Sequence, residues 1–93
     1  MNNRVSQQDM AISYELLGDV AKIQQNYSQA LYYYQQALYF SEVLLKEQPE
    51  NTSLFENTAY LHQKLSAVYQ DLQDNENMLF HHDEYQKLRA KLK

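Results

Sequence analysis

The sequence predicts an all-α protein, and its residue usage carries this prediction. The chain of 93 residues holds one glycine, Gly18, and one proline, Pro49. A sheet of short strands needs turn residues roughly every ten positions, which this chain lacks. Ala, Leu, Gln, Glu and Lys are abundant instead and mostly favour helices. Hydrophobic residues make up 44% of the chain, so residues 1–93 are expected to form a single domain with its own core.

Four segments show apolar residues at three- and four-residue spacing, which predicts four amphipathic helices. The expected helices cover about residues 6–25, 28–48, 53–72 and 75–92. Pro49 ends the second, because the residue before a proline is pushed out of helical geometry. Short turns between successive helices predict antiparallel neighbours.

Capping residues support three of the four helix starts. Ser6, followed by Asp9, resembles a capping box, and Asn26 or Ser28 can cap the second helix. A well-formed capping box of Ser53 with Glu56 predicts the start of the third helix.

The two halves of the chain repeat each other with a period of 48 residues. Shifting the sequence by this period places Ala11 on Ala59, Leu17 on Leu65, Val20 on Val68, Gln25 on Gln73, Leu31 on Leu79 and Leu44 on Leu92. Asn26 falls on Asp74, so the turn inside each half coincides as well. Each half, about 6–48 and 53–92, is therefore predicted to be one helix–turn–helix unit of a solenoid.

Small and aromatic residues follow a shared spacing in the two halves. The first half reads Tyr14-x-x-Leu17-Gly18-x-x-Ala21 and then Ala30-x-x-x-Tyr34-x-x-Ala37. The second reads His62-x-x-Leu65-Ser66-x-x-Tyr69 and then Met78-x-x-x-His82-x-x-Tyr85. This spacing resembles the tetratricopeptide repeat, in which small residues lie where two helices cross and aromatic residues fill the gaps between hairpins. The resemblance places both His62 and His82 at packing positions.

The repeat is longer than the tetratricopeptide period of about 34 residues. The excess divides into two insertions of seven residues, one on each side of Pro49, and each adds almost two helical turns. With Leu17-Gly18-Asp19 and Gln48-Pro49-Glu50-Asn51, the pattern resembles the long-helix arrays of bacterial multi-repeat proteins. Over about residues 9–88, the resemblance implies two antiparallel helical hairpins stacked as an α-solenoid in a right-handed superhelix.

The resemblance also implies a protein-binding function, because tetratricopeptide arrays hold peptides or protein surfaces in a groove lined by the first helix of each hairpin. Carried over position by position, the groove residues are Ile12, Glu15, Asp19, Lys22, Glu56, Tyr60, Gln63, Ala67 and Gln70. This surface is mixed and mildly acidic, which favours a basic or polar partner segment. Glu15 and Asp19 stand where a carboxylate clamp needs Lys and Asn, so no such clamp is predicted.

The last helix offers a second surface, because no helix follows it in the sequence. Its apolar residues are Leu79, Phe80, Tyr85, Leu88 and Leu92. The chain is either part of a longer array or a homodimer through this helix, and we favour self-association because an uncovered apolar face usually finds a partner.

Several other functions are disfavoured by the sequence. Without cysteine, a phosphate-binding glycine loop or a His-Glu-x-x-His motif, we expect no enzyme, cofactor or metal site. The adjacent His81 and His82 diverge by about 100° on a helix and cannot readily share a metal. A net charge of −4 argues against nucleic acid and anionic membranes. The start of the chain shows no apolar signal segment and no run is long enough to span a membrane, so a cytoplasmic protein is expected.

Within the run Tyr32-Tyr33-Tyr34, only Tyr34 matches a packing position, so Tyr32 or Tyr33 is expected to be partly exposed. Two alternatives to a peptide-binding adaptor stay open. One is a structural homodimerisation element, and the other is a small assembly or secretion chaperone.

Overall fold

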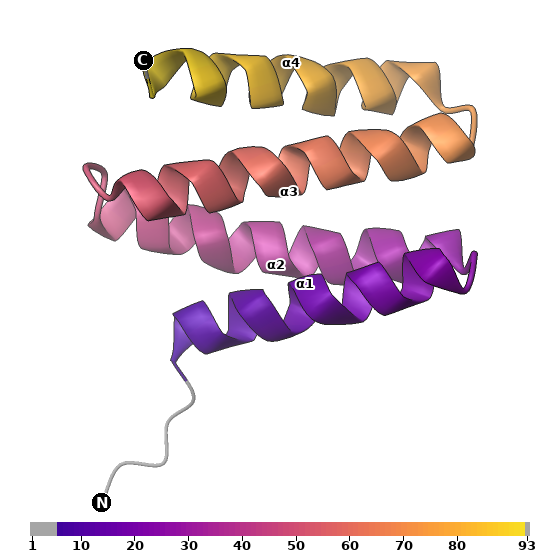
Figure 1. The fold of residues 1–93 in the computed structure, drawn as a ribbon, viewed down its shortest axis with the longest axis horizontal. Coiled ribbons are helices and arrows are strands. Elements are labelled where there is room, and N and C mark those ends of the chain that lie inside the picture. Colours follow the sequence, from indigo (N-terminus) through magenta and orange to yellow (C-terminus); the bar gives the residue numbers. More distant parts are fainter. Residues whose placement is uncertain (1–5, 93) are drawn as a thin grey trace, which may run out of the picture.

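The computed structural model describes residues 6–92. Residues 1–5, where no signal segment is expected, and Lys93 lie outside this range. Within it the protein consists of four helices and no strand: α1 (Gln7–Ile23), α2 (Tyr27–Glu47), α3 (Thr52–Asp71) and α4 (Asn75–Lys91). In Figure 1 the chain doubles back at each of the three short connections. The helices contact one another in sequence order, α1 with α2, α2 with α3 and α3 with α4, which confirms the all-α class.

Polar side chains cap all four helices. Ser6 Oγ accepts a hydrogen bond from the backbone N–H of Asp9 at 3.0 Å, as predicted. Asn26 caps α2 and Asp74 caps α4 in the same way. The predicted capping box of Ser53 with Glu56 is wrong, because Asn51 Oδ1 accepts the bond from the Leu54 N–H at 3.2 Å and α3 begins earlier.

The turn inside each half has the same geometry, as the repeat predicts. Gln25 and Gln73 both adopt the left-handed conformation, with φ of 60° and 59°. The next N–H in each turn, from Asn26 or Asp74, reaches back five residues to a helical carbonyl at 2.8 or 2.9 Å. This is the bonding pattern of a Schellman motif, which satisfies carbonyl groups at the end of a helix.

Gly18 allows α1 and α2 to cross closely. A Cβ atom on Gly18 would lie 2.6 Å from two ring carbons of the fully buried Tyr34. Ser66, its equivalent on α3, is also small, and its hydroxyl donates to the carbonyl of Met78 on α4 at 3.0 Å. Both positions therefore serve the close crossing that the motif predicts.

Most residues of the core are carried by the two middle helices, α2 and α3. Its buried residues include Ala30, Tyr34, Ala37 and Leu38 on α2 and Leu61, Leu65, Val68 and Tyr69 on α3, with Ala21 from α1. Tyr33 is half-buried and Tyr32 is exposed, as predicted for this tyrosine run. Among residues 6–92, no helix is both long enough and apolar enough to cross a membrane.

An aromatic pair joins the two helices of each half at equivalent positions. Tyr14 on α1 faces Tyr33 on α2, with ring centroids 6.2 Å apart. One repeat later, 48 residues on, His62 on α3 faces His81 on α4, with ring centroids 5.1 Å apart. The predicted packing role is thus confirmed for His62 but wrong for His82, which is exposed. On α4 the side turned toward α3 contains His81, so the motif alignment misplaces the contact by one residue.

Candidate functional site

Lys64 links the first helices of the two halves through an ion-pair cluster. Its Nζ atom lies 2.7 Å from Glu15 Oε2 and 2.9 Å from Asp19 Oδ1, both on α1. The Tyr34 hydroxyl also donates to Asp19 Oδ1. The Lys64 ammonium lies 4.7 Å from the centroid of the Tyr60 ring, within reach of a cation–π contact.

The cluster raises the pKa of two of its members, Lys64 and Tyr34. Burial alone lowers the pKa of Lys64, but its hydrogen bonds to Glu15 and Asp19 and their negative charges outweigh burial and raise it above the usual value. Burial, followed by the hydrogen bond to Asp19 and the charges of both carboxylates, raises the pKa of the Tyr34 hydroxyl. Lys64 therefore stays protonated and neutralises part of this surface.

The predicted groove residues lie on α1 and α3, but two of their carboxylates form ion pairs within the protein. Glu15 and Asp19 are half-buried and paired with Lys64, a residue that sequence reasoning missed. Lys22 and Ala67 are half-buried as well. The exposed members of the predicted set are Ile12, Glu56, Tyr60, Gln63 and Gln70. The ion pairs with Lys64 offset part of the negative charge that favoured a basic or polar partner segment, and Glu56 stays exposed.

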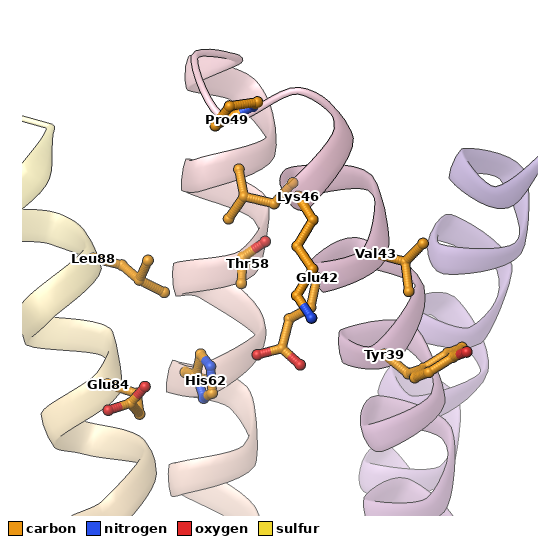
Figure 2. A pocket seen from close by; sticks show the side chains of 10 residues that line it. Tyr39, Glu42, Val43, Lys46, Pro49, Thr58, His62, Glu84 and Leu88 are labelled. Carbon is orange, nitrogen blue, oxygen red and sulfur yellow. The ribbon is translucent and has the colours of Figure 1, made fainter.

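The apolar residues of α4 do not form one uncovered face. Tyr85, Leu88 and Leu92 are half-buried, whereas Leu79 and Phe80 are exposed. Figure 2 shows Leu88 directed from α4 toward α3. The expectation that all five lack cover therefore holds only for Leu79 and Phe80.

The larger apolar surface lies instead on the outer side of α1. Its exposed residues are Ile12, Leu16, Leu17, Val20 and Ile23. The repeat explains why two of them, Leu17 and Val20, are uncovered. Leu17 is 46% exposed and Val20 is 51% exposed, but their equivalents Leu65 and Val68 on α3 are both 0% exposed. Since α2 contacts α3 and no helix within residues 6–92 lies on the outer side of α1, Leu and Val at these two positions are buried in one half and exposed in the other. The alignment of the two halves could therefore have predicted from the sequence that Leu17 and Val20 are exposed.

A cavity of about 530 Å³ lies between α2 and α4, with α3 as its floor. It is lined by Tyr39, Glu42, Val43, Leu45, Lys46, Pro49, Thr58, His62, Glu84 and Leu88. Figure 2 shows Glu42 from α2 and Leu88 from α4 directed toward the α3 residues of the floor. This volume falls within the range of small-molecule sites, about 300–1,000 Å³.

The polar groups of this cavity are perturbed but satisfied. Loss of solvation, followed by the charge of Glu84, raises the pKa of Glu42, while Lys46 acts in the opposite direction. Thr58 Oγ1 shares a 2.6 Å hydrogen bond with Ser41 and donates to the Leu54 carbonyl. Across residues 6–92, no buried side-chain nitrogen or oxygen lacks a hydrogen-bond partner. The cavity thus contains no orphaned polar group that would indicate a ligand.

His62 and His81 form a buried pair beside this cavity. Their Nδ1 atoms lie 2.8 Å apart, so one ring donates and the other accepts. Burial and the neighbouring His81 lower the pKa of His62 to about 4, and burial also lowers that of His81. In the described part of the chain, no three His, Asp or Glu side chains are arranged to hold a metal ion.

Comparisons with protein-family models, curated proteins and solved structures find no match to this chain.

Proposed function

We propose that this chain is a cytoplasmic, tetratricopeptide-like interaction module that binds another polypeptide and carries out no catalysis. The equivalent turns at Gln25 and Gln73 and the equivalent Tyr14–Tyr33 and His62–His81 pairs support two stacked helical hairpins. In this proposal the hairpins follow the right-handed superhelix of the repeat family. Stacked repeats bury their apolar sides only against neighbours and cap their ends with polar residues, so an apolar side left open on α1 supports binding of a partner there.

The observation that carries the proposal is the uncovered outer face of α1. Its five aliphatic side chains expose on the order of 500 Å², given their exposed fractions and about 170–200 Å² for a whole aliphatic residue. Patches of this size are among the largest on monomeric proteins and are often functional. A partner that covers this face gains the hydrophobic stabilisation that α3 gains from α2.

The predicted groove contributes polar contacts at the edge of this surface. Ile12 belongs to both surfaces, and Tyr60 stands exposed on α3 above Lys64. Tyrosine is favoured at protein interfaces because it combines a large apolar ring with a hydroxyl group. The charges of Glu15 and Asp19 stabilise the stacking of the two halves in this proposal and do not select a basic partner.

Site-specific photo-crosslinking in cells tests the proposal. A benzophenone amino acid at position 16 samples the outer face of α1, and one at position 60 samples the predicted groove. Position 86, on the exposed polar side of α4, is the matched control. We expect an adduct with another polypeptide at position 16 that is absent at position 86 and is lost when Val20→Asp is added.

The mass of the adduct separates the alternatives. An adduct of twice the chain's 11.1 kDa favours the structural homodimer. A larger or heterogeneous adduct favours an adaptor or an assembly chaperone. If positions 16 and 60 give no adduct above the control, the proposed function is wrong.

A further inference from the structure

We infer that the outer face of α1 accepts an amphipathic α-helix from another polypeptide, with a contact side that is uncharged and resembles the side of α2 that covers α3. This inference rests on the proposed function and specifies its partner. The repeat supplies the argument, because the protein contains the same kind of surface twice, once covered and once open.

The covered example shows what such a helix provides. Leu65 and Val68 of α3 share a buried cluster with Leu38 of α2. Polar groups of α2 at the edges of this contact find defined partners. Gln35 donates to the Tyr69 hydroxyl at 3.1 Å, and Ser41 shares a hydrogen bond with Thr58 at 2.6 Å. Around Leu38, the covering side of α2 therefore combines a large aliphatic residue with small or uncharged polar ones, while Glu42 lies at its margin and lines the cavity.

The open example on α1 requires a similar but more apolar occupant. A helix that packs on α1 as α2 packs on α3 would place its residue equivalent to Ser41 against Met10. Met10 is the residue one repeat before Thr58, and it has no hydroxyl group to share a hydrogen bond. The exposed outer side of α1 carries no charged residue from Ile12 to Ile23, its members being Ile12, Ser13, Leu16, Leu17, Val20 and Ile23. A charge buried against it would be unpaired, which is strongly unfavourable. The occupant thus presents uncharged residues, mainly aliphatic, to the centre of α1.

The last helix of a second copy, α4, does not offer such a contact side. In α4 the positions equivalent to Gln35, Leu38 and Ser41 are Asp83, Gln86 and Arg89, all exposed. Stacking α4 on the outer face of α1 would place these charges on aliphatic side chains. An α1–α1 pair would bring aliphatic residues together without the α2-like helix that the repeat provides, and a dimer that Val20→Asp dissociates would reveal such a pair.

A peptide of residues 27–47 is the direct probe, because this segment is α2 itself. A hydrocarbon staple between positions 36 and 40 keeps it helical and lies away from the Leu38 side. Binding is measured by fluorescence anisotropy of the labelled peptide with the full chain. The control peptide carries Leu38→Asp. The protein variants are Val20→Asp and, as a control on the polar side of α4, Gln86→Asp.

We expect the stapled peptide to bind the wild-type chain, and Val20→Asp to weaken binding by at least about tenfold. The Leu38→Asp peptide should fail to bind, and Gln86→Asp should leave the affinity unchanged. Because Val20 is half-exposed, Val20→Asp should keep its helical circular dichroism and cooperative unfolding.

Three results would overturn the inference. They are no peptide binding to a monomeric wild-type chain, equal affinity for wild type and Val20→Asp, and a wild-type dimer that Val20→Asp dissociates. Equal affinity would mean that the peptide displaces the chain's own α2. A photo-adduct at position 16 without peptide binding would overturn the helical partner alone, whereas the absence of both would overturn the proposed function as well.

Discussion

The buried His62–His81 pair should make the protein lose stability in mild acid. Burial disfavours the protonated form of both rings, so each has a lower pKa in the folded chain than in the unfolded chain. The charge of Glu84 acts in the opposite direction on both rings but does not cancel the effect. The unfolded state therefore binds more protons below pH 6.5, and the folded state loses stability as the pH falls from about 6.5 toward 4.

The shift of the pKa of His62 from 6.5 to about 4 sets the size of the effect. One pKa unit corresponds to about 1.4 kcal/mol, so lowering the pH from 7.5 to 5 removes about 2 kcal/mol of unfolding free energy through His62 alone. His81 adds to the loss in the same direction. For a domain of this size, 1 kcal/mol shifts the melting temperature by about 4–8 °C, so Tm should fall by about 8–16 °C.

Urea and thermal unfolding, followed by circular dichroism at pH 7.5, 6.5, 5.5 and 5.0, measure this loss. His62→Gln removes the titrating ring and keeps a neutral hydrogen-bonding side chain, so it should be less stable at pH 7.5 but lose about 2 kcal/mol less on acidification. His82→Gln is the matched control, because His82 is exposed on α4. If the wild type and His62→Gln lose the same stability between pH 7.5 and 5, the buried pair does not carry the acid sensitivity and the reasoning is refuted.

Three other substitutions test the close crossing, the turn and the ion-pair cluster. Gly18→Ala should lower the unfolding free energy in urea by about 1–2 kcal/mol despite alanine's higher helix propensity. The reason is that the ring of Tyr34 is fully buried and has no room to move away from the added Cβ atom. Equal stability of Gly18→Ala and wild type would contradict the close approach of α1 and α2. Gln25→Gly should raise Tm through a gain of about 0.5–1 kcal/mol, since glycine adopts the left-handed conformation without a Cβ clash; a loss of stability would contradict the assigned turn. Lys64→Met should lower the unfolding free energy by about 1–2 kcal/mol, because it leaves Glu15 and Asp19 without their cation. In urea unfolding, this difference from the wild type should shrink in 1 M NaCl, which screens the charges. A loss of stability that does not depend on salt would indicate lost packing only.

Local signals in the sequence predicted the helices, the turns and the repeat well. Apolar spacing located the four helices to within a few residues, and the coincidence of Asn26 with Asp74 predicted two identical turns. These features depend on neighbours in the chain, so the sequence contains most of the information. Gly18 is similar, because a glycine inside a helix indicates a close contact even when the contacting residue is unknown.

Contacts between distant helices were predicted less well. Lys64 pairs with residues 45 and 49 positions earlier, and nothing local marks it as their partner. Shifting the sequence by one repeat also placed His82 at the position of Tyr34, although α4 has a neighbour on one side only and turns His81 toward it. Sequence equivalence thus predicts which residues correspond, but burial depends on which neighbouring helices are present.

The same reasoning explains why the two ends of the molecule differ. Among residues 6–92, α1 and α4 each pack mainly against one helix, yet α1 exposes five aliphatic residues and α4 exposes mainly polar ones, with Leu79 and Phe80 as exceptions. If both ends were only surfaces toward water, the hydrophobic effect would favour polar residues equally on both. At the positions that α2 uses to cover α3, α4 carries Asp83, Gln86 and Arg89, as expected of an end that faces solvent. The aliphatic residues on α1 have no such explanation, and the association proposed for this face would account for the asymmetry.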